Sequence, residues 1–330
     1  MPLPRRLPLA GLAVMLLAAT ACTRASNGTG LRLGAPVPGT PVPRAIQFQD
    51  CTDRLLAVGV TVPKPLRGTV RIGCGTLQVP LDYAHPSGRS ISLEVLRLHT
   101  SQNTTRPVRS LLFNPGGPGA SGINLGVGLY AELPAAIARA YDFVIFDPRG
   151  VGLSAPVRCL TDRQTDQLGA QTTDVTTRAG LAQAKRLDLQ YEQRCRAALG
   201  GNLRFYNTVA TARDMDQIRQ AVGDDRLNYL GYSYGTELGW TYAHLFPRQV
   251  RTVVLDGAVD PTMSAAAQAL QQLKGFEDAF GQFAAHCRAT SCLGRDDPHA
   301  AVAQIFAEAR SRPLPTGSSR VLTESLAGTG

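Results

Sequence analysis

One serine of this 330-residue chain, Ser233, lies in the pattern Gly-x-Ser-x-Gly. This pattern places a serine on a sharp turn between a strand and a helix, where its hydroxyl is exposed and can act as a nucleophile. Residues 226–230 predict the strand, and residues 236–246 predict the helix, which Pro247 ends. A helix N-terminus behind the serine would add unpaired N–H groups and a positive dipole end, both suited to an oxyanion. We interpret Ser233 as a candidate nucleophile; the alternative is a glycine-flanked turn whose serine only caps a helix.

A second glycine-rich segment, residues 114–122, follows a short apolar strand predicted at 110–113. Acyl transfer through serine needs two backbone donors aimed at the oxyanion. In a strand–turn–helix context one donor is the N–H of the residue after the nucleophile, here Tyr234, and the other comes from an earlier loop. Gly116 and Gly117 are placed to supply it, because glycine lets the backbone approach a substrate closely. The flanking prolines stiffen this loop, so little reorganisation is needed.

The pattern of apolar residues predicts an α/β protein with a mostly parallel sheet, because buried strands alternate with helical stretches. A hairpin precedes these units, and residues 160–200 form a helical excursion beside the sheet. We expect Asp214 and Asp216 in the first turn of their helix, where acids complement its dipole. The predicted strands are 70–81, 90–98, 110–113, 143–146, 226–230 and 252–255; the predicted helices are 129–139, 211–222, 236–246 and much of 265–330.

Composition excludes several classes of function. With 44% hydrophobic and 18% charged residues, the chain can bury a full core and is not disordered. Its net charge of +9 is scattered without runs, which favours a solvated basic surface over nucleic-acid binding. The cysteines show no CxxC spacing, so we expect no zinc. The sequence shows no sign of any other metal or of an organic cofactor, and we expect none. A phosphate-binding loop at Gly126-x-Gly128-x-x-Ala131 is a weak alternative, since no strand directly precedes it and no P-loop lysine follows.

The N-terminus predicts export. Two arginines precede the apolar run 7–19, which is too short to span a bilayer and is typical of a signal peptide covering residues 1–21. Residues 19–22, Ala-Thr-Ala-Cys, resemble a bacterial lipobox, so we expect Cys22 to be lipidated and to anchor the protein to the membrane. The alternative is ordinary Ala-x-Ala cleavage beside an incidental cysteine. Residues 22–49 are rich in Gly, Pro, Ser and Thr for most of their length and predict a flexible tether.

The cysteines predict disulfide bonds. Setting Cys22 aside leaves six of the seven, an even number in a chain expected to be exported. Six cysteines allow 15 pairings. Proximity in the sequence favours Cys51–Cys74, Cys159–Cys195 and Cys287–Cys292.

Three segments together resemble a known family. Residues 114–122, 147–154 and 231–236, in this order and spacing, look like the α/β-hydrolase family of prolyl iminopeptidases and secreted bacterial tripeptidyl aminopeptidases. The resemblance runs from about residue 50 to the end of the chain and is closest to the tripeptidyl aminopeptidase branch, whose members are exported and often lipid-anchored. It implies an α/β-hydrolase fold with its core at 50–259 and the start of a helical cap at 260–330.

The resemblance also implies roles for single residues. Ser233 would be the nucleophile, the N–H groups of Gly117 and Tyr234 would form the oxyanion hole, and the substrate would be a peptide with a free N-terminus. Asp147 and Arg149 match a position that we interpret as structural, bracing the turn after a core strand.

The catalytic base is the departure from the family. The chain order should be Ser, Asp, His, so the base should follow Ser233. His244 lies about three turns, or about 16 Å, along the same helix and cannot reach back. His286 and His299 are expected at the surface of the helical region, and Asp256 matches a structural turn rather than the catalytic acid. We expect the acid and the histidine beyond residue 330, which would leave this chain inactive by itself, with core strands missing and an open sheet edge.

Three functions remain open. The first is a secreted, membrane-tethered serine exopeptidase, for which cap acids such as Glu277 and Asp278 could bind the peptide amine. The second is an ester or lipid hydrolase of the same fold, because fold does not decide function. The third is a non-catalytic envelope lipoprotein that uses the fold for binding.

Overall fold

The computed structural model describes the chain between residues 42 and 323 with short gaps. The predicted signal peptide and Cys22 lie outside the described residues, as does most of the predicted tether. The described residues are 42–66, 68–100, 102, 108–171, 173, 177–292, 297–316 and 321–323.

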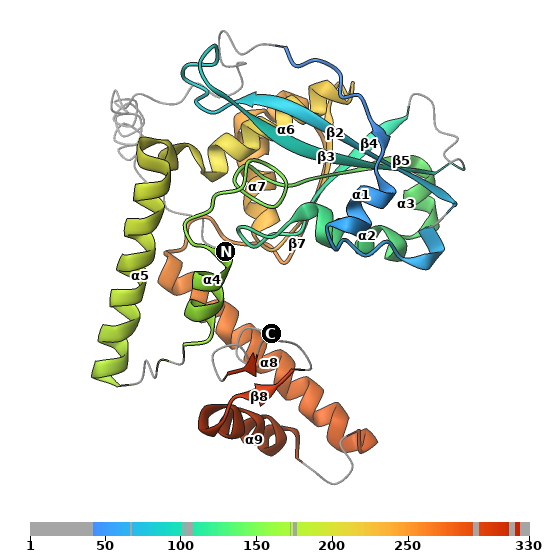
Figure 1. Ribbon diagram of the computed structural model, residues 1–330. Coiled ribbons are helices and arrows are strands. Elements are labelled where there is room, and N and C mark those ends of the chain that lie inside the picture. The colour runs from blue at the N-terminus through green and yellow to red at the C-terminus, as the bar shows by residue number, and fades with distance from the viewer. Residues whose placement is uncertain are drawn as a thin grey trace, which may run out of the picture.

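A seven-stranded mixed sheet forms the centre of the protein (Figure 1). Its order is β1-β2-β3-β5-β4-β6-β7, and the strands from β5 to β7 run parallel while β1, β2 and β3 pair antiparallel. The predicted hairpin is β2–β3, and each predicted strand is present with slightly different ends. The strands are β1 Gln49–Asp50, β2 Val70–Pro80, β3 Ser90–Thr100, β4 Arg109–Asn114, β5 Tyr141–Phe146, β6 Leu227–Tyr232 and β7 Val250–Asp256.

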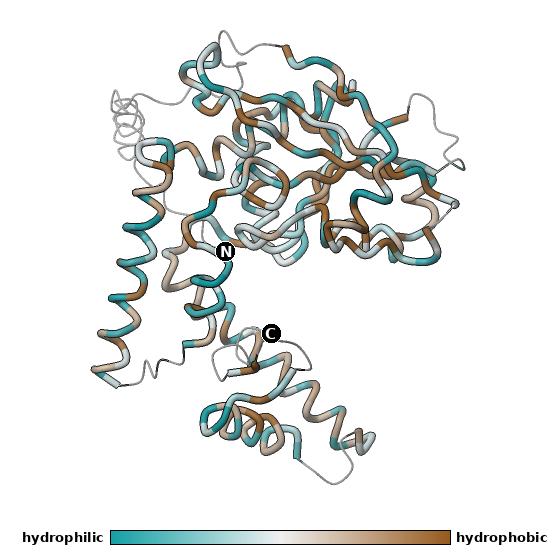
Figure 2. The backbone as a smooth tube through the Cα atoms, in the orientation of Figure 1, coloured by the Kyte–Doolittle hydropathy of each residue, from teal (hydrophilic) through white to brown (hydrophobic). Residues whose placement is uncertain are grey.

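Helices cover both faces of this sheet because its central strands bury side chains on both sides. In β5, Val144 and Phe146 join one apolar cluster with residues of α6 and α7, while Phe143 and Ile145 join a second with α1 and α2. Apolar residues accordingly concentrate in the sheet (Figure 2). These helices are α1 Thr52–Ala57, α2 Gly122–Glu132, α3 Ala135–Ala140, α6 Thr208–Ala221 and α7 Tyr234–Leu245.

The predicted helix at 129–139 is wrong in its extent. The chain forms two helices here, α2 and α3, separated at Leu133 and Pro134. The first begins earlier than predicted because the Ser121 hydroxyl accepts a hydrogen bond from the Asn124 N–H and caps it. Gly126 is therefore inside a helix and packs against Ile145, which rules out a phosphate-binding loop at this position.

The prediction for Asp214 and Asp216 is also wrong. The helix α6 begins at Thr208 with Asn207 as its N-cap, so both acids lie in its interior rather than in its first turn. Both are buried, and they pair with Arg149 and Arg219 respectively. Their role is to form buried ion pairs, not to complement the helix dipole.

The ordered core begins before residue 50, the boundary predicted from the sequence. Ile46 is buried, its N–H donates to the Ala221 carbonyl, and its side chain fills the space that Gly75 leaves open on β2. All three predicted disulfides are confirmed: Cys51–Cys74, Cys159–Cys195 and Cys287–Cys292.

The remaining helices, α4, α5, α8 and α9, do not cover the sheet but extend away from it (Figure 1). The strand β7 forms one edge of the sheet and leaves Val254 and Leu255 partly exposed; Leu270, Leu273 and Phe276 of α8 are exposed as well. Within the described residues, no helix combines the length and apolar character that crossing a membrane requires. The bounds of these helices are α4 Asp162–Gly169, α5 Arg178–Leu199, α8 Ala265–Thr290 and α9 Pro298–Ser311. Three 3-10 helices are described, at Lys64–Leu66, Gly200–Phe205 and Pro247–Gln249. A short hairpin pairs β8 Leu314–Pro315 with β9 Val321–Leu322.

Candidate active site

Ser233 occupies a strained turn between β6 and α7. Its backbone has φ +53° and ψ −123°, a conformation that residues other than glycine rarely adopt. Two hydrogen bonds hold this conformation: the Ser233 N–H donates to the Asp256 carbonyl at 2.9 Å, and its carbonyl accepts from the Thr236 N–H at 2.8 Å. Strain that the surrounding structure maintains in this way is typical of functional positions.

The two glycines of the motif allow the strand and the helix to close on this serine. A Cβ atom at Gly231 would lie 2.4 Å from the Gly235 carbonyl oxygen, and one at Gly235 would lie 2.5 Å from the Asn114 carbonyl oxygen. Any larger residue would therefore separate β6 from α7 or push away the end of β4. The predicted strand–turn–helix geometry is present, and it exposes Ser233.

The glycine-rich loop after β4 lies against this turn. Gly116 has φ +104°, and a Cβ on it would lie 2.6 Å from the Tyr232 carbonyl oxygen and 2.9 Å from the Ser233 Cβ. Its N–H donates to the Asn114 Oδ1 at 2.9 Å, so this donor is already used. The next N–H, that of Gly117, has no partner among the described residues and is the loop donor left for a ligand.

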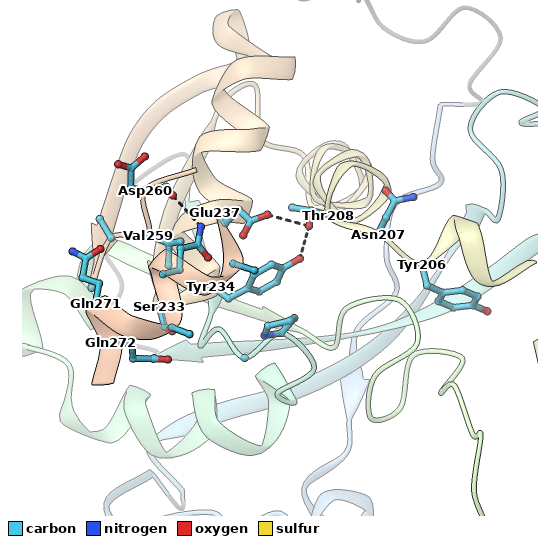
Figure 3. A pocket seen from close by; sticks show the side chains of 17 residues that line it. Tyr206, Asn207, Thr208, Ser233, Tyr234, Glu237, Val259, Asp260, Gln271 and Gln272 are labelled. Atoms are coloured by element: carbon cyan, nitrogen blue, oxygen red, sulfur yellow. Dashed lines mark hydrogen bonds between the residues drawn. The ribbon is translucent and has the colours of Figure 1, made fainter. Parts of the chain in front are cut away.

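A cleft of about 820 Å³ brings together the three residues predicted from the sequence, Ser233, Gly117 and Tyr234 (Figure 3). One wall is the start of α6 with the residues before it, and the other is the connection from β7 together with the first turns of α8. The remaining lining residues are Pro118, Tyr206, Asn207, Thr208, Glu237, Gly257, Ala258, Val259, Asp260, Ala265, Gln268, Ala269, Gln271 and Gln272.

Hydrogen bonds link the starts of α6 and α7 across this cleft. The Thr208 hydroxyl lies 2.9 Å from the Tyr234 hydroxyl and 3.4 Å from the Glu237 Oε1 (Figure 3). Burial raises the pKa of Tyr234, the hydrogen bond between Tyr234 and Thr208 opposes this shift, and the charge of Glu237 reinforces it. Tyr234 therefore keeps its proton near neutral pH. Neither Thr208 nor Glu237 belongs to a motif that we recognised in the sequence. For Glu237, the available signal was an acid in the first turn of the helix after the serine.

Asp147 has the bracing role that the sequence indicated. Its Oδ1 accepts from the Ser121 hydroxyl at 2.7 Å and from the Ile123 N–H at 3.2 Å, and its Oδ2 accepts from the Leu153 N–H at 2.8 Å. Asp147 thereby joins the end of β5 to the start of α2, the helix that follows the glycine-rich loop.

Arg149 joins the cleft wall to the sheet. It is buried, forms two hydrogen bonds of 2.6 and 2.7 Å with Asp214, and donates to the Phe205 carbonyl directly before the cleft residue Tyr206. Burial alone would lower the pKa of Arg149, but the charge and hydrogen bonds of Asp214 raise it. Arg149 therefore stays charged, and its hydrogen bonds fix the segment that leads into α6.

No histidine of the described chain lines the cleft. His244 packs against Trp240, and His299 packs against Phe280, with 4.9 Å between ring centres. His99 pairs with Asp142 at 2.6 Å, but Asp142 lies at the start of β5, the end of the parallel strands opposite Ser233.

The predicted acids also lie elsewhere. Asp256 contacts Ser233 through its backbone carbonyl, as expected for a structural turn. Glu277 and Asp278 are exposed on α8 outside the residues that line the cleft. Among the residues that the structure describes, no group of three His, Cys, Asp or Glu side chains could hold a metal ion.

Comparison with known proteins supports this fold. A family model described as "alpha/beta hydrolase fold" matches residues 109–304. The chain is 40% identical over 296 residues to the "Serine protease Hip1" of Mycobacterium tuberculosis, covering 89% of this chain and 54% of that protein. It is 38% identical over 232 residues to the "Tripeptidyl aminopeptidase" of Streptomyces coelicolor, covering 69% of this chain and 41% of that one.

A third relative is the "Carboxylesterase B" of Mycobacterium tuberculosis, which is 40% identical over 268 residues, covering 78% of this chain and 50% of that protein. The chain thus spans about half the length of the curated relatives that it matches.

Proposed function

This chain belongs to the α/β-hydrolase fold family, and we propose that it is a serine exopeptidase that releases short peptides from free N-termini. Ser233 is the nucleophile, and the N–H groups of Gly117 and Tyr234 form the oxyanion hole. The observation that carries the proposal is the strained turn at Ser233, φ +53°, which shares one cleft with both donors. The relatives named serine protease and tripeptidyl aminopeptidase support a peptide substrate.

The chemistry follows from this geometry. The Ser233 Oγ attacks the carbonyl carbon of the scissile amide, and the carbonyl oxygen becomes an oxyanion that accepts from the Gly117 and Tyr234 N–H groups. Each such donor contributes roughly 3–4 kcal/mol to stabilising the transition state. The start of α7 adds its positive dipole end. The serine proton passes to a histidine, which we propose follows residue 330 together with its acid, as the family order of Ser, Asp, His requires.

We also propose that the protein is exported and anchored to the membrane through a lipidated Cys22. The lipobox-like residues 19–22 support this proposal. Metabolic labelling with a fatty acid tests it: label retained in a Cys22→Ala variant would contradict it.

Ester hydrolysis is the second candidate, because the carboxylesterase relative is also 40% identical to this chain, over 268 residues compared with 296 for the protease. The two candidates differ in which acyl group reaches Ser233. An exopeptidase cleft receives a peptide, whereas an esterase cleft receives a simple acyl or alkyl chain.

Covalent modification of Ser233 separates the candidates. The purified chain is incubated with a tripeptidyl diphenyl phosphonate or with an alkyl diphenyl phosphonate, which share a leaving group, and adducts are counted by intact-mass spectrometry. We expect a single adduct, absent from Ser233→Ala, which forms faster with the peptidyl reagent. Added imidazole accelerates it by supplying the base. Faster reaction with the alkyl reagent would favour the esterase. No adduct with either reagent, even with added imidazole, would instead support a non-catalytic binding protein.

A further inference from the structure

The cleft around Ser233 is acidic although the protein is basic. Its lining includes two carboxylates, Glu237 and Asp260, and none of the lining residues of the described chain is an arginine, lysine or histidine. The chain as a whole has a net charge of +9. A cleft whose lining carries only negative charge raises the local concentration of cations and disfavours anionic ligands.

The two carboxylates of the cleft differ in their partners. The Asp260 Oδ1 accepts from both the N–H and the hydroxyl of Thr262, which is the bonding of a local turn. Glu237 is only partly exposed, and its one described contact is the Thr208 hydroxyl at 3.4 Å.

Three other acids with restricted exposure have arginine partners, whereas the buried Asp147 is satisfied by two backbone N–H groups and one hydroxyl. Glu94 pairs with Arg54, Asp214 with Arg149, and Asp216 with Arg219. Glu237 has no ion pair within the described structure, so its charge is available to a ligand.

The hydrogen-bond chain orients Glu237. Tyr234 retains its proton and can donate to the Thr208 Oγ1, which leaves the Thr208 hydroxyl proton free to donate to Glu237. The side chain of Glu237 is therefore held in the same cleft as Ser233, one turn further along α7 (Figure 3).

We propose that Glu237 binds a positively charged group of the substrate and thereby determines which carbonyl lies against Ser233. This inference rests on the proposed exopeptidase function and adds the residue that sets substrate position. The α-ammonium of a free N-terminus is the cation that an exopeptidase substrate always carries; a lysine or arginine side chain presents the same chemistry. A helix-stabilising role alone would also place an acid in the first turn of α7, but it would not make binding depend on substrate charge.

Calorimetric binding to the full chain tests the proposal without requiring turnover. The ligands are Ala-Ala-Ala amide, its N-acetyl form, and N-acetyl-Ala-Ala-Lys amide, so that the cation is N-terminal, absent, or on a side chain. We expect at least one cationic peptide to bind about tenfold or more tighter than the neutral one, as for a hydrogen bond to a charged group. The first and third peptides identify which source of the cation is used.

Three variants localise the effect. Glu237→Gln removes the preference for a cation, because the amide keeps the shape without the charge. Asp260→Asn, the matched change in the other cleft carboxylate, retains the preference. Thr208→Val keeps the Glu237 charge but loses its orienting hydrogen bond, so the preference decreases without disappearing. Thermal unfolding of each variant shows that it is folded.

Three results overturn the proposal. The first is equal binding of charged and neutral peptides, and the second is a cation preference that survives in folded Glu237→Gln. The third is the absence of binding by all three peptides. The Ser233 adduct reports on the proposed function separately. If the peptidyl phosphonate modifies Ser233 while peptide binding is independent of charge, only the role of Glu237 is refuted.

Discussion

Gly116 lies against the turn that holds Ser233. The Gly116→Ala substitution therefore tests whether the glycine-rich loop supplies the Gly117 N–H as the proposed oxyanion donor. A Cβ at this position would lie 2.6 Å from the Tyr232 carbonyl oxygen and 3.1 Å from the Tyr234 nitrogen. Both are backbone atoms at the turn that holds Ser233, and they cannot rotate away as a side chain would. We expect the loop to retreat from this turn and to carry the Gly117 N–H with it.

The size of the effect follows from two costs. A residue other than glycine in such a strained backbone conformation costs of order 1–3 kcal/mol, which lowers the free energy of unfolding. Loss of one oxyanion donor costs about 3–4 kcal/mol of transition-state stabilisation, or roughly 10²–10³-fold in rate. We therefore expect Gly116→Ala to slow modification of Ser233 by roughly this factor in a protein that still folds.

Gly119 provides a matched control. It lies in the same loop at φ +96°, close to the φ +104° of Gly116, but a Cβ there would meet no atom within 4 Å. Gly119→Ala therefore imposes similar backbone strain without the contact at the serine turn. We expect a similar loss of thermal stability with little change in the reactivity of Ser233.

The assay is the rate of Ser233 modification by the peptidyl phosphonate, followed by intact mass, together with thermal unfolding by circular dichroism. Equal modification rates for Gly116→Ala and the protein without the substitution would refute this reasoning. So would an equal loss of rate in Gly119→Ala, because general strain rather than contact with the turn would then explain the effect.

Two further predictions concern elements that support the cleft. Arg149→Met leaves the buried Asp214 charge unpaired and should lower the free energy of unfolding by about 3–5 kcal/mol in urea titrations. The double variant Arg149→Met/Asp214→Leu should lose less of this free energy than the single variant. A larger loss in the double variant would contradict this account. Replacing Cys159 and Cys195 by serine opens a loop with a sequence separation of 36 and should cost about 2–4 kcal/mol in the same assay. The Ser233 modification rate should not change in this second variant, because neither cysteine lines the cleft.

The sequence was sufficient for features whose parts are adjacent in the chain. The serine turn joins one strand directly to one helix, so its motif and the flanking periodicity predict its geometry together. The disulfides could be paired by proximity for the same reason, since each closes a loop between neighbouring cysteines.

Local signals also existed at the two helices whose predicted extents are wrong. Pro134 separates α2 from α3, and Asn207 is a typical N-cap that places the start of α6 earlier than predicted. The burial of Asp214, by contrast, could not be inferred locally. Its partner Arg149 lies 65 positions away and approaches it only after α6 packs on the sheet.

The sequence by itself indicated the turn at Ser233, the glycine-rich loop, most of the strands and helices in their order and the favoured cysteine pairs, because each depends on short-range spacing or on periodicity. Only the tertiary structure decided the character of the cleft. Thr208 and Glu237 are 29 positions apart, on two helices that pack against the same face of the sheet and begin at the same cleft. The acidity of this cleft arises because the packing places two carboxylates, and no arginine, lysine or histidine, among its described lining residues.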